Sequence, residues 1–257
     1  MPTNQRRRYQ TKPDLLAGRT IVVTGAGDGL GRTAAKAFAA HEADLILIGR
    51  TRSKLEQVND EIRDAYGQNS LIVPLDLATL NEQLIEDLRK GLAESYGKID
   101  GLLHNAGILG PKTTLEHYPI PAWMNAFEIN VHSTLKLTQS VLPIMKNSPD
   151  ASIIFTSSGL SKSGRAYWGS YCVTKFALEG LMEVLAEELS TTTNIRVNSL
   201  NPGAVRTTMR AQAYPAEDPQ TLPHPDERMS AYLYLMGPDS KGVTRQNFYA
   251  GDWYPNS

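Results

Sequence analysis

The stretch TIVVTGAGDGLG, residues 20–31, joins a short apolar run to a glycine-rich turn. Its Val and Ile residues are consecutive rather than alternating with polar residues, which is typical of a strand covered on both faces. Gly25, Gly29 and Gly31 follow directly and open a stretch with helical character. Such glycines let backbone N–H groups and the helix dipole approach a pyrophosphate, although a tight turn without a ligand is the simpler alternative. The spacing, Thr-Gly-x3-Gly-x-Gly, fits neither GxGxxG in frame nor a P-loop.

The same alternation of apolar runs and longer amphipathic stretches continues along the chain. We expect strands at 20–24, 44–49, 70–76, 100–105, 152–157, 195–201 and 246–250. Between them we expect helices near 29–41, 52–65, 80–97, 122–146, 167–190 and 224–236. This βαβ order predicts an α/β fold with a doubly wound, mostly parallel seven-stranded sheet and helices on both faces. We expect one domain over residues 18–257, preceded by an N-terminal tail at 1–17.

Composition excludes several classes of protein. The chain has 257 residues and a formal net charge of -1, which gives no broad basic surface for nucleic acid. Its single cysteine, Cys172, cannot form an intrachain disulfide, and the five histidines lack ligand spacing, so we predict no metal site. These features suit a reducing cytoplasm and a small-molecule partner.

The N-terminal segment carries a run of arginines, Arg6 to Arg8, whose role the sequence does not reveal. The residues that follow, YQTKPDLLAGR, lack the apolar core of an export signal, so we expect a solvated tail. No apolar run reaches the roughly 18–20 residues that cross a bilayer, and we predict no membrane association.

Residues 170–175, SYCVTK, place Tyr171 and Lys175 four positions apart. On a helix the two side chains project from one face, close enough for the ammonium to act on the phenol. One such pair arises readily by chance and is a weak motif by itself.

Several further motifs accompany this pair in a fixed order. They are Thr24 to Gly31, the triplet Asn105-Ala106-Gly107, Asn130, Ser158, and the turn Pro202-Gly203. Together they resemble the short-chain dehydrogenase/reductase family, in which the serine and tyrosine usually keep the 13-residue interval seen here (171 minus 158). The segments YQTKPDLLAGR, LHNAGILG, FTSSG, GRAYWGSY and AYPAEDPQ are similar to its bacterial YciK-like oxidoreductase subgroup. The resemblance implies a Rossmann-type fold and an NAD(P)(H)-dependent oxidoreductase.

The resemblance also implies four catalytic residues. Tyr171 would be the general acid/base that exchanges a proton with the substrate oxygen, and Lys175 would lower the pKa of this phenol. Ser158 would hold the substrate oxygen, with Ser157 as the neighbouring alternative. Asn130 would hold a water that connects Lys175 to solvent; the alternative is a helix-surface asparagine.

Cofactor contacts follow from the same resemblance. Asp76 would contact the adenine edge, although it could simply begin a helical turn. Lys175 would also bond to the nicotinamide ribose. The residues that would contact the cofactor are Thr24, Gly25, Gly29, Leu30, Gly31, Arg50, Asp76, Leu77, Asn105, Ala106, Gly107, Tyr171, Lys175, Pro202, Gly203 and Thr207.

The end of the strand at 44–49 bears on cofactor choice. NAD enzymes usually carry Asp or Glu there, whereas this chain has Gly49 followed by Arg50 and, two residues on, Arg52. A guanidinium suits a 2'-phosphate, so NADP(H) is preferred and NAD(H) is the alternative. Asp28 opposes this choice, since it would either repel the phosphate or pair with Arg50.

The substrate region is less defined by sequence. Tyr167 and Trp168 either line the pocket mouth or pack, and Met209 to Pro223 should form a loop and short helix over it, within a substrate loop at about 208–226. The substrate is expected to be a partly apolar carbonyl or secondary alcohol. One alternative is a non-catalytic NAD(P)-binding sensor on the same fold. Another is a sugar epimerase or dehydratase, and the short chain and the glycine spacing disfavour this second alternative. Relatives pair the helices near 122–146 and 167–190, which implies a homodimer or homotetramer.

Overall fold

Seven parallel strands form the main sheet of the computed structural model, which describes residues 7–255. The strands are β2 (Thr20–Thr24), β3 (Asp44–Gly49), β4 (Leu71–Pro74), β5 (Gly101–His104), β6 (Ala151–Thr156), β7 (Ile195–Asn201) and β8 (Asn247–Tyr249). Their order is β4-β3-β2-β5-β6-β7-β8, and each neighbouring pair is parallel. All seven predicted strands are confirmed, with ends that differ by at most two residues.

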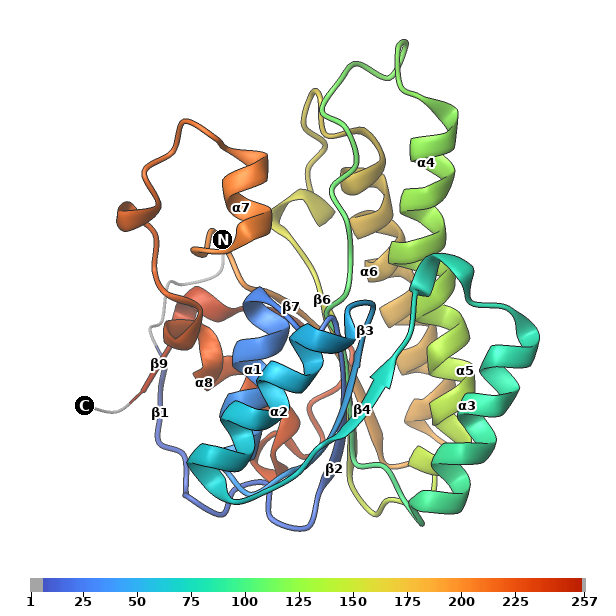
Figure 1. Cartoon of the computed structure of the whole chain (residues 1–257), viewed down its shortest axis with the longest axis vertical. Coiled ribbons are helices and arrows are strands. Elements are labelled where there is room, and N and C mark those ends of the chain that lie inside the picture. Colours follow the sequence, from blue (N-terminus) through green and yellow to red (C-terminus); the bar gives the residue numbers. More distant parts are fainter. Residues whose placement is uncertain (1–6, 256–257) are drawn as a thin grey trace.

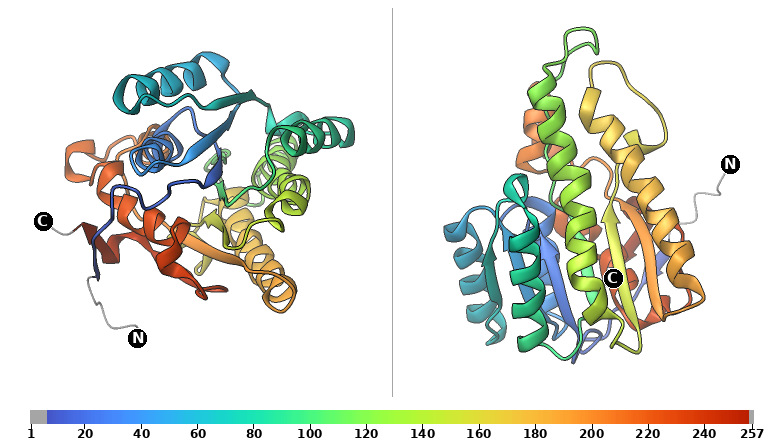
Figure 2. Two further views of the ribbon diagram at one scale, coloured as in Figure 1. Left: turned by 90° about the horizontal axis from the view of Figure 1, so that it is seen from below. Right: turned by 90° about the vertical axis from the view of Figure 1, so that its right-hand side faces the viewer.

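Helices cover both faces of this sheet (Figures 1 and 2). One face carries α1 (Gly29–Ala39), α2 (Arg52–Tyr66) and α8 (Met229–Met236), whose apolar side chains share one core cluster with the strands. The other carries α3 (Glu82–Ser95), α5 (Ser133–Met145) and α6 (Gly169–Ser190), which share a second cluster. The predicted doubly wound fold is confirmed, because both faces of the strands are buried.

The predicted helix at 122–146 consists of three parts. It comprises α4 (Ile120–Phe127), a π-helical turn at Glu128–His132, and α5. Turns of this kind interrupt a helix without ending it and are frequent at functional sites. Asn130 lies inside this turn.

The chain reverses its winding direction between β2 and β5. From β2 it proceeds to β3 and β4 at one edge, then returns to β5 on the other side of β2. In open parallel sheets, ligands bind beyond the carboxyl ends of the strands at such a switch point. The topology therefore places the candidate site next to Thr24 and Asn105.

The predicted N-terminal tail is largely exposed over residues 7–17, but it is not separate from the domain. Residues Arg7–Tyr9 form β1, which pairs in parallel with β9 (Trp253–Pro255). The Tyr9 ring packs edge-on against Tyr234, at 5.4 Å between centroids, and its hydroxyl donates to Asp239 at 2.9 Å. Leu15 and Leu16 are buried in the core. The partner strand lies at the opposite end of the sequence, so no local pattern predicts this pairing. Arg6, the first residue of the arginine run, lies outside the described residues.

Membrane-spanning helices are absent from the described part of the chain. No helix within residues 7–255 combines the length and the apolar character needed to cross a bilayer.

Candidate active site

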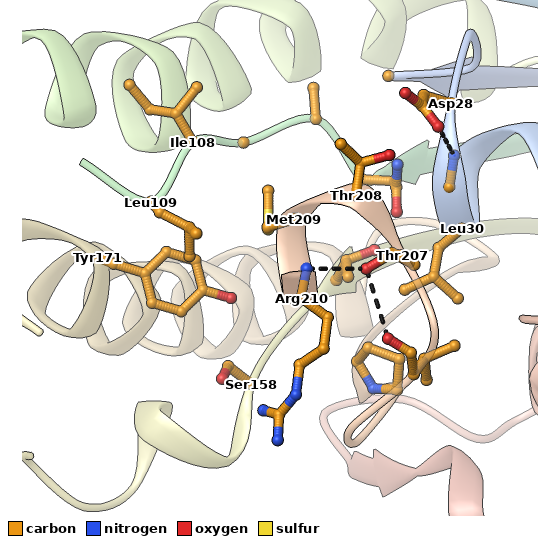
Figure 3. A pocket seen from close by; sticks show the side chains of 18 of the residues that line it. Asp28, Leu30, Ile108, Leu109, Ser158, Tyr171, Thr207, Thr208, Met209 and Arg210 are labelled. Carbon is orange, nitrogen blue, oxygen red and sulfur yellow. Dashed lines mark hydrogen bonds between the residues drawn. The ribbon is translucent and has the colours of Figure 1, made fainter. Parts of the chain in front are cut away.

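A cavity of about 780 Å³ opens beyond the carboxyl ends of the central strands (Figure 3). Most of the predicted site residues line it. These are Gly25, Gly29, Leu30, Arg50, Asp76, Leu77, Asn105, Ala106, Gly107, Ser158, Tyr171, Lys175, Pro202, Gly203 and Thr207. Three predicted residues, Thr24, Gly31 and Asn130, do not line the cavity and act from behind its wall.

The glycine turn at residues 25–31 forms one wall. Gly25 and Gly29 have φ angles of +65° and +52°, which residues with side chains rarely adopt. Asp28 caps α1 by accepting a hydrogen bond from the Gly29 N–H at 2.7 Å. A Cβ at Gly31 would lie 2.3 Å from the Gly25 carbonyl oxygen, so this glycine permits the turn to pack against the helix. The wall presents backbone and a helix start, a geometry that fits a diphosphate.

Thr24 holds the neighbouring loop in place. Its buried hydroxyl donates to the Leu103 carbonyl at 3.2 Å. It also accepts from the backbone N–H groups of Asn105 and Ala106, at 2.9 and 3.1 Å. One side chain at the end of β2 therefore fixes the start of the Asn105–Gly107 wall.

Asn130 plays a comparable part behind Lys175. Its amide accepts from the Ile108 N–H at 2.8 Å and donates to the Ile108 carbonyl at 3.0 Å. It also donates to the Thr174 hydroxyl at 3.0 Å. With 1% exposure, Asn130 is no helix-surface residue; it ties the loop after β5 to α6. The bonded water assigned to it stays a prediction.

Tyr171, Lys175 and Ser158 meet in the cavity. Lys175 Nζ lies 5.6 Å from the Tyr171 ring centroid and donates to the Thr156 carbonyl at 2.6 Å. Ser158 follows β6 and lines the cavity together with Tyr171 (Figure 3). Ser157 lines the cavity as well, but its hydroxyl donates to the Glu179 carboxylate, which favours Ser158 as the residue free to donate to a substrate oxygen.

The protonation of this group differs from the sequence prediction. Burial raises the pKa of Tyr171, and the nearby Ser158 hydroxyl opposes this only in part. Burial also lowers the pKa of Lys175 to about 8, with the Glu179 carboxylate acting in the opposite direction. In the protein alone the phenol pKa is therefore not lowered overall, because desolvation dominates; the lowering that Lys175 itself would contribute stays a prediction.

The end of β3 carries the expected basic group. Arg50 is exposed on the cavity wall, and within residues 7–255 it has no hydrogen-bond or ion-pair partner. Asp28 does not pair with it: its carboxylate binds Lys54 at 2.8 Å, and this hydrogen bond lowers the pKa of Asp28. Arg52 lies 3.7 Å from Glu56 on an exposed face. Asp28 is thus neutralised by a neighbour, and Arg50 stays available for an anion.

Asp76 begins a helical turn, which was the simpler alternative, and its contact with the adenine stays a prediction. Its carboxylate accepts from the Ala78 N–H at 3.0 Å and so begins a helical turn at Leu77–Thr79. Together with Leu77, it also lines the cavity.

We call the walls formed by lining residues of the segments 25–30, 49–51, 76–77 and 105–107 the cofactor side. The opposite wall, the substrate side, comprises Leu109, Arg165, Trp168, Tyr171, Thr208, Met209, Arg210, Ala213 and Tyr214. The predicted short helix is present as α7 (Thr208–Ala213), which lines this side, and a 3-10 turn follows at Pro219–Thr221. The substrate loop at about 208–226 stays a prediction.

Sequence reasoning identified only part of the substrate side. Trp168 is buried and lines the cavity, whereas Tyr167 is 58% exposed and does not. Arg165, Arg210 and Tyr214 were missed. The only available signal was their basic and aromatic character within segments already expected to border the pocket.

Comparisons with known proteins agree with this geometry. Residues 19–218 match the family model described as short chain dehydrogenase. The Escherichia coli protein YciK, an uncharacterized oxidoreductase, is 44% identical over 94% of this chain and 95% of its own length.

Two solved structures share the fold and much of the sequence. A short-chain dehydrogenase from Pseudomonas syringae has a TM-score of 0.93 and 49% identity, covering 95% of this chain and 99% of its own. One from Shigella flexneri, complexed with NADP, has a TM-score of 0.91 and 44% identity, covering 93% and 100%. Since the family model spans most of the chain and the Escherichia coli relative is 44% identical over 94% of it, this protein belongs to the short-chain dehydrogenase/reductase family of oxidoreductases.

Proposed function

We propose that this chain catalyses reversible hydride transfer between NADP(H) and a carbonyl or secondary alcohol substrate, with Tyr171 as general acid/base. One observation carries the proposal: Ser158, Tyr171 and Lys175 line the same cavity as the glycine turn. A positioned hydroxyl pair of this kind can bind and protonate one carbonyl oxygen.

The residues of the cofactor side would hold the dinucleotide. The backbone of the turn at 25–31 would face the diphosphate, Arg50 the 2'-phosphate, and Asp76 with Leu77 the adenine. Asn105 to Gly107 would lie along the ribose, while Pro202, Gly203 and Thr207 would border the nicotinamide. The NADP complex of the Shigella flexneri relative supports this choice over NAD(H), as does the unpaired Arg50. When bound, the nicotinamide supplies or accepts the hydride.

The protein's own part is to position oxygen and move one proton. Ser158 donates a hydrogen bond to the substrate oxygen, where negative charge develops during reduction. Tyr171 donates its phenolic proton to that oxygen, and in oxidation it removes the alcohol proton. Lys175, protonated below its pKa of about 8, stabilises the phenolate that results. Asn130 ties α6, which carries Tyr171 and Lys175, to the loop after β5.

Replacing Tyr171 by Phe tests the proposal. We expect NADPH oxidation with a panel of ketones and aldehydes to fall by about 10²–10⁴-fold, the usual contribution of general acid catalysis. NADPH affinity should change little, because only one hydroxyl is lost. The matched control is Tyr167→Phe, an exposed tyrosine four residues away, which should keep wild-type turnover. Cofactor binding by the wild type without turnover of any carbonyl would contradict the proposal and favour the sensor.

We also propose that the protein is a homodimer or homotetramer. Leu135, Phe176 and Val184 are 42, 44 and 57% exposed on α5 and α6, more than their apolar character suits. Sedimentation should give a multiple of 28.3 kDa, and Val184→Glu should shift it toward the monomer. A 28.3 kDa particle alone for the wild type at micromolar concentration would refute this. A cytoplasmic location and a single domain over 18–257 likewise stay proposals.

A further inference from the structure

Three basic side chains surround Tyr214 at the edge of the substrate side. The Arg210 guanidinium carbon lies 3.7 Å from the Tyr214 ring centroid, that of Arg165 lies at 6.0 Å, and Lys112 Nζ at 4.8 Å. Only Arg210 has a carboxylate partner, Glu217, which it binds through two hydrogen bonds of 2.6 Å. Within residues 7–255, neither Lys112 nor Arg165 forms an ion pair. We call this edge, formed by Lys112, Arg165, Arg210 and Tyr214, the rim. It carries an excess of positive charge.

The Arg165 side chain is positioned by a hydrogen bond, but within the described residues no carboxylate neutralises its charge. Its Nη1 donates to the Tyr214 hydroxyl at 2.9 Å, and its side chain lines the cavity. No other hydrogen-bond partner of its guanidinium lies within the described residues. A guanidinium has five N–H donors in a fixed fork, so most of them remain for a ligand, and the fork matches an anionic oxygen pair.

Carboxylates are absent from the substrate side among the described lining residues. The acidic lining residues, Asp28 and Asp76, both belong to the cofactor side, and Asp28 is paired with Lys54. An uncharged substrate would gain nothing from this arrangement. The charge pattern distinguishes an anion at this rim from the 2'-phosphate of the cofactor, which would meet Arg50 on the opposite wall.

An apolar wall connects the rim to the reacting groups. The Trp168 ring centroid lies 5.8 Å from that of Tyr171 and 5.5 Å from that of Tyr214, so Trp168 bridges the two. Leu109 and Leu160 pack in the same cluster. Figure 3 shows Leu109, Ser158, Tyr171, Met209 and Arg210 among the side chains of one pocket. The path from Tyr171 to Arg165 thus runs along apolar and aromatic surface.

Resting on the proposed function, we propose that the substrate carries an anionic group, a carboxylate or phosphate, which Arg165 binds at the rim. The carbonyl or alcohol carbon lies at Ser158 and Tyr171, and an apolar segment between the two ends packs on Trp168. Hydride transfer leaves the anionic group unchanged. Arg165 acts as a specificity residue with no part in proton transfer, and Lys112 adds to the positive potential.

Binding to the NADPH-loaded enzyme tests this without turnover. Calorimetric titration with phenylacetate, phenyl phosphate and phenylacetamide compares two anions with a neutral molecule of similar shape. We expect at least one anion to bind about tenfold or more tightly than the amide, the usual worth of a charge-assisted hydrogen bond. The tighter anion identifies the group. Equal affinity for all three molecules would overturn the inference.

Two charge-matched variants locate the site. Arg165→Gln should remove most of the preference for the anion and leave amide affinity unchanged. Lys162→Gln makes the same change of charge three residues away, on a side chain outside the cavity lining, and should behave as wild type. If both variants lost the same part of the preference for the anion, the preference would come from a general surface potential. That result would overturn the assignment to Arg165.

Turnover separates this inference from the proposed function. If neutral ketones and their acidic analogues are reduced equally well, the inference fails and the oxidoreductase function stands. If anions bind through Arg165 but no carbonyl of either class is reduced, the proposed function fails and the anion site stands.

Discussion

The cofactor side of the cavity is built mostly from backbone, whereas the substrate side is built from side chains that come from separate segments. On the cofactor side, the glycine turn at 25–31 presents main chain, and the buried Thr24 hydroxyl holds the start of the triplet at 105–107. On the substrate side, Arg165, Trp168 and Tyr214 come from separate segments, and Lys112 of a third lies over two of these rings. Backbone geometry serves a cofactor of constant shape, while exchangeable side chains allow substrates to differ between proteins that share the fold.

Thr24→Val gives the largest effect that this comparison predicts. The substitution keeps the shape but leaves the N–H groups of Asn105 and Ala106 without their acceptor. Since each buried unsatisfied group costs about 1–3 kcal/mol, we expect a loss of about 2–4 kcal/mol in the free energy of unfolding. NADPH affinity should fall as well. Urea unfolding and a fluorescence titration measure the two effects.

Thr20→Val is the matched control. Thr20 begins the same strand and is buried, but its hydroxyl has no hydrogen-bond partner among the described residues. We expect its stability to stay within about 0.5 kcal/mol of wild type. If both variants lost the same free energy of unfolding, the cofactor side would not depend on the Thr24 hydroxyl. The contrast between the two sides would then be weakened.

Arg50→Asp tests the one place where the cofactor side relies on a side chain for selectivity. We expect NADPH affinity to fall about tenfold to hundredfold, because a charge-assisted contact is replaced by repulsion, while NADH affinity holds or improves. Titrations with both reduced cofactors measure this. Arg63→Asp, at the far end of α2, makes the same change of charge and should alter neither affinity. Tighter binding of NADH than of NADPH by the wild type would overturn the choice of cofactor.

The two sides also differ in how far the sequence predicted them. The strands and the cofactor side were predictable because each depends on a contiguous pattern: a continuous apolar run, a glycine spacing, or a triplet directly after a strand. Asn130, Ser158, Tyr171 and Lys175 were identified through a family pattern of fixed order and spacing. All but Asn130 line the cavity, and Asn130 lies directly behind it.

Contacts between distant segments were not predictable. Arg165 meets Tyr214 across 49 positions, and β1 pairs with β9 near the other end of the chain. Asp28 forms its ion pair with Lys54 rather than with Arg50, because the pairing depends on side-chain directions at the start of α2. Likewise, spacing suggested that Lys175 acidifies Tyr171, whereas the burial of both groups, which no local pattern reports, determines their pKa values.

A further prediction concerns Lys175, where the two sides meet. Burial lowers its pKa from 10.5 to about 8, so between these pH values the unfolded chain binds one more proton than the folded protein. The free energy of unfolding should therefore rise with pH in this window, by at most about 1.4 kcal/mol per pH unit. Tyr171 opposes this only above pH 10, because burial raises its pKa and the folded protein then retains the phenolic proton. Between pH 8 and 10, the contribution of Lys175 to stability can therefore be measured without that of Tyr171.

Urea unfolding of wild type and Lys175→Met across that window measures the contribution of Lys175. The stability of wild type relative to the variant should increase from pH 8 to 10, since Met carries no proton to release. Lys146→Met, which removes an exposed lysine at the end of α5, should keep the wild-type slope. Identical slopes for wild type and Lys175→Met would mean that the ammonium is not desolvated in the folded protein. In that case the border between the two sides would be open to water.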